Sequence, residues 1–539
     1  MDSLFFGQKY SLRNQNLTRA LDKVIATPEH FVRMVVHPTG LYSTLGVDIL
    51  ANRDSGVTLA TTRAEFRREV EREFISHFGA EAWSAIARAL TKPPKWTCIR
   101  ATGGEKEVLQ VMEELRDLTQ HQYPISQLPS LGDCIRLDFA HRETDLVPEA
   151  RVIVDTGCGE AVLRGADVFA PGVKGCTAGL LAGVIVQVWI DLDNALMRGD
   201  KDSVSSASAR RRLLYIGLGR TAQPRSEMFH EARKGVAVHM LHRPTGDSPA
   251  LHSLLDGKIF LQNLPSALVC HALGPQPGEL VLDMCASPGG KTSHVAAMMQ
   301  NQGVLVACDR TVNKVLPVLE CCNKFAVHHG HATNQGFLFC CRTDSSKACS
   351  GSNSTVGKSD YSLGSGEERR QALLTCLALQ PVQEQGVVML NGGGLPLGVF
   401  DRVLLDGPCS SLGLRPRFSH IAMTNAALEE MSVVQKRMLF NAIMLVKVGG
   451  FISYSTCTFN PGENEQVVRW ALDLFRGVIR LVPVLPQLGQ PGLRSILSDK
   501  EANLVQRFDP SNMAVDSIGF FVAKFEKLAN SSEVERVWV

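Results

Sequence analysis

The sequence predicts an α/β protein whose C-terminal half is a doubly wound, Rossmann-like parallel sheet. Strands and helices alternate from about residue 260 onward, which is typical of that architecture. A glycine-rich turn at 285–291 joins an expected strand to an expected helix, as in many nucleotide-binding sheets. Upstream, short β-type runs with glycine punctuation between residues 152 and 218 predict a compact β-barrel.

Length and charge set the first limits. The chain has 539 residues, enough for two to four domains, and its formal net charge is only +2. A nucleic-acid partner would therefore have to be held by a local basic patch. The longest apolar run, 178–190, is shorter than the ~20 residues of a membrane helix. With no secretory signal expected at residues 1–15, we predict a soluble, cytoplasmic protein without a membrane partner.

The 15 cysteines are scattered without a Cys-x-x-Cys pair. Such spacing favours neither a zinc site nor a disulfide framework, so we expect free thiols in a reducing compartment and no metal.

The first domain, expected over 1–148, is a helical and α/β module. Charged residues around an apolar stripe at 62–74 predict a helix, which fits a solvated surface better than a binding face. A strand at 97–100 and a helix at 105–119 follow.

The barrel is expected over 149–222. Its clearest β-type runs are 162–173 and 184–190. A polar loop then leads from Arg198 to the basic triplet Arg210, Arg211 and Arg212, which by itself fits a solvated surface better than a nucleic-acid contact.

The third domain is expected over 223–530. Its predicted strands are 280–283, 304–309, 337–341, 399–405, 450–455 and 518–525. Residues 345–398 break the alternation and begin with a Ser/Gly-rich stretch, which indicates a surface insertion or an exon absent from the mature protein.

The turn at 285–291 and two downstream aspartates form a candidate ligand site. Paired glycines let a backbone approach a ligand, and a helix N-terminus favours anionic groups, although the spacing is not that of a P-loop. Asp309 ends the next strand, where an acid accepts hydrogen bonds from ribose hydroxyls or caps a helix. Asp344 follows the third strand as a ligand contact or a turn residue.

Two cysteines follow predicted strands. Cys409 comes after the strand 399–405 and Cys457 after 450–455, so both thiols should emerge at the carboxyl edge of the sheet, where open α/β folds bind ligands. Either cysteine alone would more readily be a small buried hydrophobe.

These motifs together resemble the NOP/Sun (NSUN) family of S-adenosylmethionine-dependent RNA cytosine-5 methyltransferases. The match lies in residues 285–291, 406–410 and 455–458, and it extends over about 255–525. Residues 152–218 resemble a PUA domain, an RNA-binding barrel, and 260–266 resemble the PUA-containing tRNA methyltransferases of the family. The resemblance implies a methyltransferase fold with an N-terminal RNA-binding module interrupted by the barrel. It also implies a monomeric enzyme that acts on an acceptor-stem cytosine near the tRNA CCA end.

The resemblance also implies roles for single residues. Cys457 would attack cytosine C6, Cys409 would assist release, Asp406 would contact the N3/N4 edge of the base, and Lys291 would lower the thiolate pKa or orient the base. The implied cofactor contacts are Cys285, Ala286, Ser287, Pro288, Gly289, Gly290, Lys291, Asp309, Asp344 and Asp406. Ser287, Gly407 and Ser411 depart from the commoner family pattern, which has Ala and Gly at the last two.

A basic and aromatic surface on the barrel is the candidate RNA contact. Its members would be Arg164, Phe169, Arg198, Lys201, Arg210, Arg211 and Arg212. An aromatic ring can stack on an RNA base, but Phe169 fits the barrel core equally well.

Two other functions compete with this one. A non-catalytic RNA-binding protein could keep the methyltransferase fold as a scaffold, with the insertion disturbing the Asp344 contact. A DNA cytosine-5 methyltransferase also uses a Pro-Cys thiol, here Cys409, but the second cysteine motif and the PUA-like segment argue against it.

Overall fold

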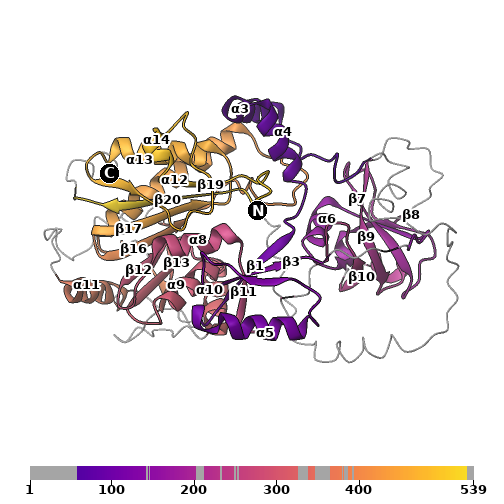
Figure 1. Cartoon of the computed structure of the whole chain (residues 1–539), viewed down its shortest axis with the longest axis horizontal. Coiled ribbons are helices and arrows are strands. Elements are labelled where there is room, and N and C mark those ends of the chain that lie inside the picture. The colour runs from indigo at the N-terminus through magenta and orange to yellow at the C-terminus, as the bar shows by residue number, and fades with distance from the viewer. Residues whose placement is uncertain are drawn as a thin grey trace.

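The computed structural model describes most of the chain from residue 57 to residue 530 (Figure 1). The described residues are 57–140, 144, 146–201, 212–230, 234–247, 251, 254–325, 338–345, 365–378, 380, 387–390 and 394–530, with only the backbone of Lys201. Arg210 and Arg211 lie outside them, as do the residues 346–364 of the predicted insertion.

A largely parallel sheet forms the C-terminal half, as predicted, and it has nine strands among the described residues, three more than the six expected. The strand order is β15-β14-β13-β12-β16-β17-β20-β18, with β19 paired to β20. Pairing is parallel from β15 to β17, and the edge beyond β17 is antiparallel. The strands are β12 (Leu280–Asp283), β13 (Val304–Asp309), β14 (Leu338–Arg342), β15 (Val388–Met389), β16 (Phe400–Asp406), β17 (Val446–Thr456), β18 (Ile479–Val482), β19 (Gln506–Phe508) and β20 (Phe520–Lys527).

Helices cover both faces of this sheet because its central strands are apolar on both sides. One face packs against α8 (Leu264–Leu273), α9 (Gly290–Met298) and α10 (Val312–Lys324). The other packs against α11 (Gly366–Ala378), α12 (Asn425–Leu445), α13 (Glu465–Leu474) and, through Ala502, α14 (Asp499–Ala502). Because helices bury both faces of the sheet, side chains on both sides of each central strand are apolar, and the strands are nearly continuous apolar runs in the sequence.

The predicted surface insertion is partly integrated into the fold. Within 345–398, α11 buries Leu373 and Leu377 against the sheet, and β15 pairs with β14. These residues of the predicted insertion therefore pack with the sheet. Two-residue strands such as β15 are too short to leave a periodic signal in the sequence.

The N-terminal module contains a four-stranded antiparallel sheet in the order β11-β1-β3-β2. Its elements are α3 (Arg68–Phe78), α4 (Ala80–Ala89), β1 (Trp96–Ala101), a 3-10 turn (Glu105–Glu107), α5 (Val108–Leu118), β2 (Ile125–Gln127), β3 (Cys134–Asp138) and β11 (Ile259–Leu261). Because β11 follows the barrel in sequence, the barrel interrupts the module, as predicted. The buried Arg100 of β1 donates to the Ser293 hydroxyl (2.9 Å) and so ties the module to α9.

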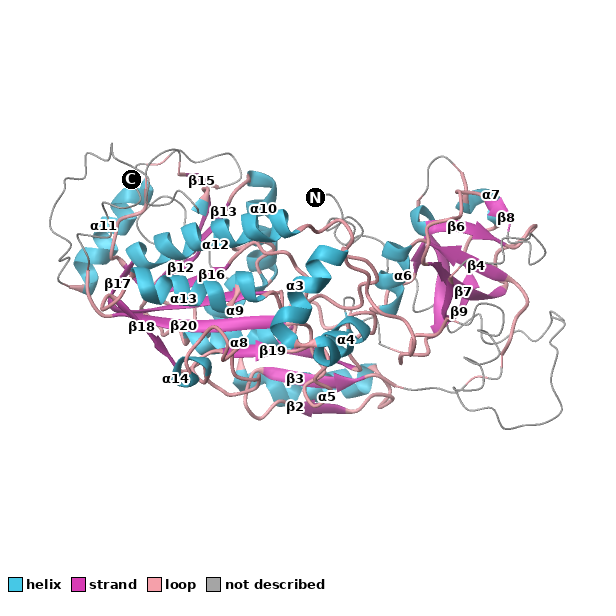
Figure 2. Cartoon of the chain, turned by 90° about the horizontal axis from the view of Figure 1, so that it is seen from above, coloured by secondary structure: helices cyan, strands magenta, loops and turns pink. Residues whose placement is uncertain are grey.

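The barrel lies at one end of the molecule (Figure 2). Its seven strands run in the order β5-β10-β9-β7-β4-β6-β8. They are β4 (Arg151–Val154), β5 (Val168–Phe169), β6 (Val173–Cys176), β7 (Ile185–Asp191), β8 (Asp200–Lys201), β9 (Leu213–Thr221) and β10 (Val236–His242), with α6 (Thr156–Leu163) and α7 (Arg225–Met228). The sheet continues past residue 222, the predicted end of the domain, because β10 pairs with β9.

The barrel contacts the loop that follows Cys409. Phe418 packs into the barrel core, and its N–H donates to Glu160 of α6 (2.9 Å). No helix in the described part of the chain is long and apolar enough to span a bilayer.

Candidate active site

Two parallel strands bring the two candidate thiols together. Asp406 at the end of β16 lies opposite Ser455 near the end of β17, and the chain continues from these ends to Cys409 and Cys457. The two Sγ atoms are 3.3 Å apart. Both cysteines are partly exposed as residues.

The surroundings of the two thiols make them unequal. The hydrogen bond from Cys409 lowers the pKa of Cys457, against the opposing effect of burial, and Ser411 and Lys291 act in the same direction. The same hydrogen bond, together with burial, raises the pKa of Cys409 well above its usual value. The pair therefore ionises first at Cys457, and Cys409 keeps its proton.

An ion pair lies beside the thiols. Lys291 Nζ is 2.6 Å from Asp406 Oδ2, and Ser455 donates to Asp406 Oδ1 at 2.5 Å. Burial disfavours the ammonium, but Asp406 outweighs this and raises the pKa of Lys291. Lys291 is therefore a cation, and Asp406 is held in a fixed orientation by two partners.

A fully buried acid, which the sequence analysis missed, connects the two cysteine loops. Glu463 Oε2 accepts from the N–H of Ser410 (2.8 Å) and from Gln435 (2.9 Å), and Oε1 accepts from Asn460 (3.0 Å). Ser410 also donates to the Thr458 hydroxyl at 2.9 Å. The short polar run after Cys457 is the sequence feature that could have indicated Glu463. Residues 460 and 463–465 of this run are buried.

The turn at 285–291 lies between β12 and the start of α9. Gly289 has φ of +107°, a backbone that favours glycine, and a Cβ on Gly290 would meet the Phe260 ring at 2.7 Å. Burial raises the pKa of the Cys285 thiol well above its ordinary value, so Cys285 is no competing nucleophile.

The aspartates at the strand ends surround this turn. Asp309 Oδ2 accepts from the N–H of Ser287 (3.1 Å), and Asp344 lies directly before Ser345, whose hydroxyl donates to the Met284 carbonyl (2.5 Å). Asp283, which the sequence analysis did not single out, is buried under the turn and accepts from Thr292 (2.8 Å). Burial raises the pKa of Asp283 to about 7.

This set of groups fits a nucleoside-bearing cofactor. It offers a close-approach glycine turn, the N-terminus of α9 and a strand-end carboxylate at Asp309, all on the edge of the sheet that carries the thiols.

The candidate RNA residues of the barrel have different surroundings. Phe169 is 45% exposed and therefore belongs to the surface, not to the barrel core. Arg198 donates to the Met228 carbonyl (2.8 Å), and Arg164 donates to the Pro416 carbonyl (3.3 Å). Arg212 pairs with both Glu65 and Asp193 at 2.7 Å. Three of the arginines thus hold protein groups.

Among the described residues, one group of side chains has the composition of a metal site. Asp133 accepts from His271 and from His294, both at 2.7 Å. These are hydrogen-bond distances, so the triad joins the N-terminal module to α8 and α9 through direct side-chain hydrogen bonds.

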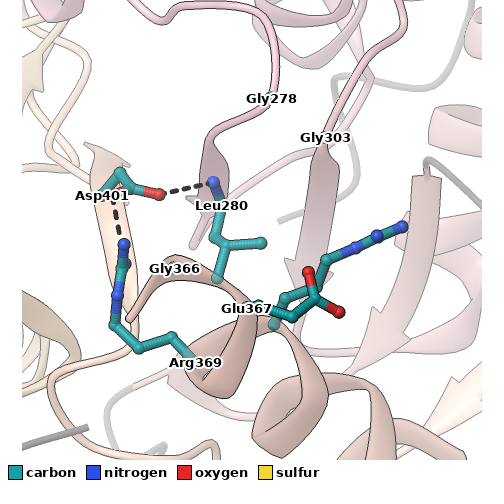
Figure 3. Close-up of a pocket in the computed structure, with 8 residues that line it drawn as sticks. Gly278, Leu280, Gly303, Gly366, Glu367, Arg369 and Asp401 are labelled. Carbon is teal, nitrogen blue, oxygen red and sulfur yellow. Dashed lines mark hydrogen bonds and ion pairs between the residues drawn. The ribbon is translucent and has the colours of Figure 1, made fainter. Parts of the chain in front are cut away.

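A separate cavity of about 260 Å³ lies at the opposite edge of the sheet (Figure 3). It is lined by residues at the starts of β12, β13 and β16 and by α11, and Arg369 pairs with Asp401 beside it (3.0 Å). The parallel strands therefore separate this cavity from the thiols.

Comparison with known proteins gives two family matches. The family described as 16S rRNA methyltransferase RsmB/F matches residues 270–339 and 375–526. The PUA domain matches residues 150–205.

Full-length relatives extend these matches. The chain is 35% identical to "rRNA (cytosine-C(5))-methyltransferase NOP2C" of Arabidopsis thaliana, with 85% of this chain and 90% of that protein covered. It is 33% identical to "tRNA (cytosine(72)-C(5))-methyltransferase NSUN6" of Homo sapiens, with 86% and 92% covered. The crystal structure of NSun6 from Pyrococcus horikoshii with SFG shares the fold, with a TM-score of 0.62 and 24% identity over 86% of this chain and 99% of that one.

Proposed function

Because this chain belongs to the NOP/Sun (RsmB/F) family of S-adenosylmethionine-dependent RNA cytosine-5 methyltransferases, we propose that it methylates a cytosine of tRNA, in the acceptor stem near the 3′ CCA end. The observation that carries the proposal is the 3.3 Å pair of Cys409 and Cys457 beside the Lys291–Asp406 ion pair. In this proposal residues 1–148 and the barrel bind RNA, and residues 223–530 catalyse the reaction as a monomer.

The chemistry requires a nucleophile because cytosine C5 does not attack a methyl donor unaided. In the first step the Cys457 thiolate adds to C6, which breaks the C5–C6 double bond and turns the ring into an enamine with a nucleophilic C5. Asp406 contacts the N3/N4 edge of the base, and the proton that N3 takes up as negative charge moves onto the ring passes from the Lys291 ammonium, 2.6 Å away, through Asp406. Lys291 keeps Asp406 oriented and stabilises the thiolate before attack.

S-adenosylmethionine, when bound, supplies the methyl group; residues 285–291, Asp309, Asp344 and Asp406 would hold it. After transfer, water takes the C5 proton, whose electron pair re-forms the C5–C6 double bond. The sulfur–C6 bond then breaks with its electrons leaving on Cys457 as thiolate, and N3 returns its proton through Asp406 to Lys291. Cys409 is the group placed to assist this release, because its sulfur is 3.3 Å from the sulfur that departs.

The choice of tRNA over rRNA rests on which relatives match the whole chain. Relatives named as tRNA enzymes in Homo sapiens, Mus musculus and Pyrococcus horikoshii match over 79–88% of this chain. Relatives named as 25S, 26S or 28S rRNA enzymes match over 55–56% of it. The Arabidopsis relative named for rRNA matches over 85% of this chain and makes rRNA the second candidate substrate. The free thiols of the described cysteines suit the reducing cytoplasm.

Bisulfite mapping of methylated RNA tests this proposal. Purified tRNA and purified rRNA are each incubated with S-adenosylmethionine and either wild-type protein, Cys457→Ala or the control Cys376→Ala, whose thiol lies on α11 away from the site. We expect one new 5-methylcytosine in the acceptor stem with wild type and Cys376→Ala, and none with Cys457→Ala. Methylation of rRNA alone would refute the substrate. Undiminished methylation by Cys457→Ala would refute the nucleophile, and no methylation by the wild type would favour a non-catalytic RNA-binding protein.

A further inference from the structure

Ser411 has a backbone conformation that serine seldom adopts. It lies two residues after Cys409 with φ of +55°, in the left-handed region where glycine is relaxed and a residue with a Cβ is not. The turn is fixed by its neighbours, because the N–H of Gly413 donates to the carbonyl of Cys457 (3.0 Å). Glycine would adopt this turn with less backbone strain than serine. We therefore ask what the side chain of Ser411 contacts.

That side chain lies against both thiols. Its Oγ is 3.5 Å from Cys457 Sγ and 3.9 Å from Cys409 Sγ, distances within hydrogen-bonding reach of sulfur. Lys291 makes its close contact with Asp406. Among the described residues, Ser411 and Cys409 are the groups with a hydrogen-bond contact to the Cys457 sulfur.

We propose that the Ser411 hydroxyl is a catalytic group of this site, which donates a hydrogen bond to the Cys457 sulfur in its thiolate form and thereby helps select Cys457 as the attacking thiol. The proposal rests on the proposed function, in which Cys457 attacks the cytosine. A hydroxyl can turn from accepting a bond from the neutral thiol to donating one to the thiolate, because its hydrogen rotates about the Cβ–Oγ bond.

Selectivity follows from the unequal distances. Both the Cys409 thiol and the Ser411 hydroxyl can donate to the Cys457 sulfur, so a negative charge there has two donors. A charge on Cys409 would have the longer, 3.9 Å contact to the same hydroxyl. The Ser411 hydroxyl would also stabilise the thiolate that is released when the sulfur–C6 bond breaks. Ser411 itself exchanges no atoms in either step.

The test measures ionisation of each thiol without RNA or cofactor. Wild type, Ser411→Ala and Ser411→Gly are alkylated with iodoacetamide at a series of pH values, and mass spectrometry of the peptides separates Cys457 from Cys409. Both variants lack the hydroxyl, but only Ser411→Gly also relieves the left-handed backbone, so the pair separates the hydroxyl from the conformation. Ser419→Ala, an exposed serine on the same loop, is the control.

We expect the pH midpoint for alkylation of Cys457 to rise by about one unit in both variants, since a hydrogen bond to a charged group is removed. The control should keep the wild-type midpoint. An unchanged midpoint in both variants, or a shift in only one of them, would overturn the proposal. Because Ser411→Gly relaxes the backbone, it remains informative if Ser411→Ala does not fold.

This result is independent of the substrate. Undiminished methylation by Cys457→Ala would refute Cys457 as the nucleophile, whether or not the alkylation midpoint of Cys457 shifts in the Ser411 variants. Conversely, unchanged midpoints with a fully inactive Cys457→Ala protein would refute only the role of Ser411.

Discussion

The sulfur atoms of Cys409 and Cys457 lie 3.3 Å apart although the residues are 48 positions apart in the chain. Parallel pairing of β16 with β17 brings the two strand ends together, and Glu463 then fixes the loops that carry the thiols. The hydrogen bond between the two sulfurs lowers the pKa of Cys457 and raises the pKa of Cys409, so Cys457 is the thiol that ionises more readily. The two thiols of the site are therefore chemically unequal.

Replacing Cys409 should trap the enzyme on its substrate. In Cys409→Ala the thiolate of Cys457 can still attack, but release after methyl transfer is impaired, so we expect a covalent protein–RNA adduct and loss of turnover. The measurement is a denaturing gel with labelled tRNA and S-adenosylmethionine. The double variant Cys409→Ala with Cys457→Ala should form no adduct. Loss of turnover without any adduct would contradict the release role.

Replacing Glu463 should misplace the thiols without changing cofactor binding. Glu463→Gln puts a donor where two N–H groups now converge, so we expect the free energy of unfolding to fall by about 2 kcal/mol. Turnover should fall by on the order of 10²-fold because the reacting sulfurs shift. Kinetics, cofactor titration and denaturant unfolding measure these effects. The control Glu526→Gln, in a surface pair with Arg480, should change stability by less than about 1 kcal/mol. Wild-type turnover in Glu463→Gln would contradict the positioning role.

The Asp133–His271–His294 triad predicts a stability change between pH 6.5 and pH 9. Burial alone would lower the pKa of His271, but the hydrogen bond to Asp133 outweighs it and raises the pKa from 6.5 to about 9. The folded protein therefore holds this proton more tightly than the unfolded chain. The stabilisation, about 3 kcal/mol, is complete below pH 6.5 and is lost as the pH rises through 9.

Denaturant unfolding at successive pH values checks this. The stability difference between wild type and His271→Gln should shrink from pH 6.5 to 9.5. His294 is the matched control, because burial lowers its pKa from 6.5 to about 4 and it therefore titrates below pH 6.5. Above pH 6.5, the free energy of unfolding of His294→Gln should decline with pH as it does in the wild type. A difference between wild type and His271→Gln that is constant over this range would rule out the ion pair.

The arginine triplet predicts a change in the salt dependence of RNA binding. Neutralising Arg210, Arg211 and Arg212 together should weaken tRNA binding and reduce the slope of log affinity against log salt. The expected reduction is about 0.7 for each phosphate of a single strand that the protein no longer neutralises. Arg212→Ser alone should leave the slope unchanged, because Glu65 and Asp193 already pair with Arg212. Filter binding at several salt concentrations measures the slope. An unchanged slope in the triple variant would show that the three arginines do not contact RNA phosphates.

The sequence was sufficient to predict the catalytic sheet because its buried strands are apolar on both faces. The strands 280–283 and 304–309 were predicted at their observed bounds. The amphipathic helix predicted at 62–74 begins later, at Arg68, since a helical charge pattern does not mark the first residue without a side-chain cap. The barrel strand β10 and the short strand β15 were missed because pairing with β9 and β14, not local pattern, defines them.

By itself the sequence determined that two cysteines and an aspartate follow strand ends at the carboxyl edge of a parallel sheet, since strand direction and the order of motifs are local properties. Only the tertiary structure decided their relationship. It shows which thiol has the lowered pKa, that Lys291 pairs with Asp406, and that Glu463 and Ser411 contact the loops that carry the thiols. Those facts depend on burial and on distances of 2.6 to 3.5 Å between residues far apart in the chain, which no local pattern contains.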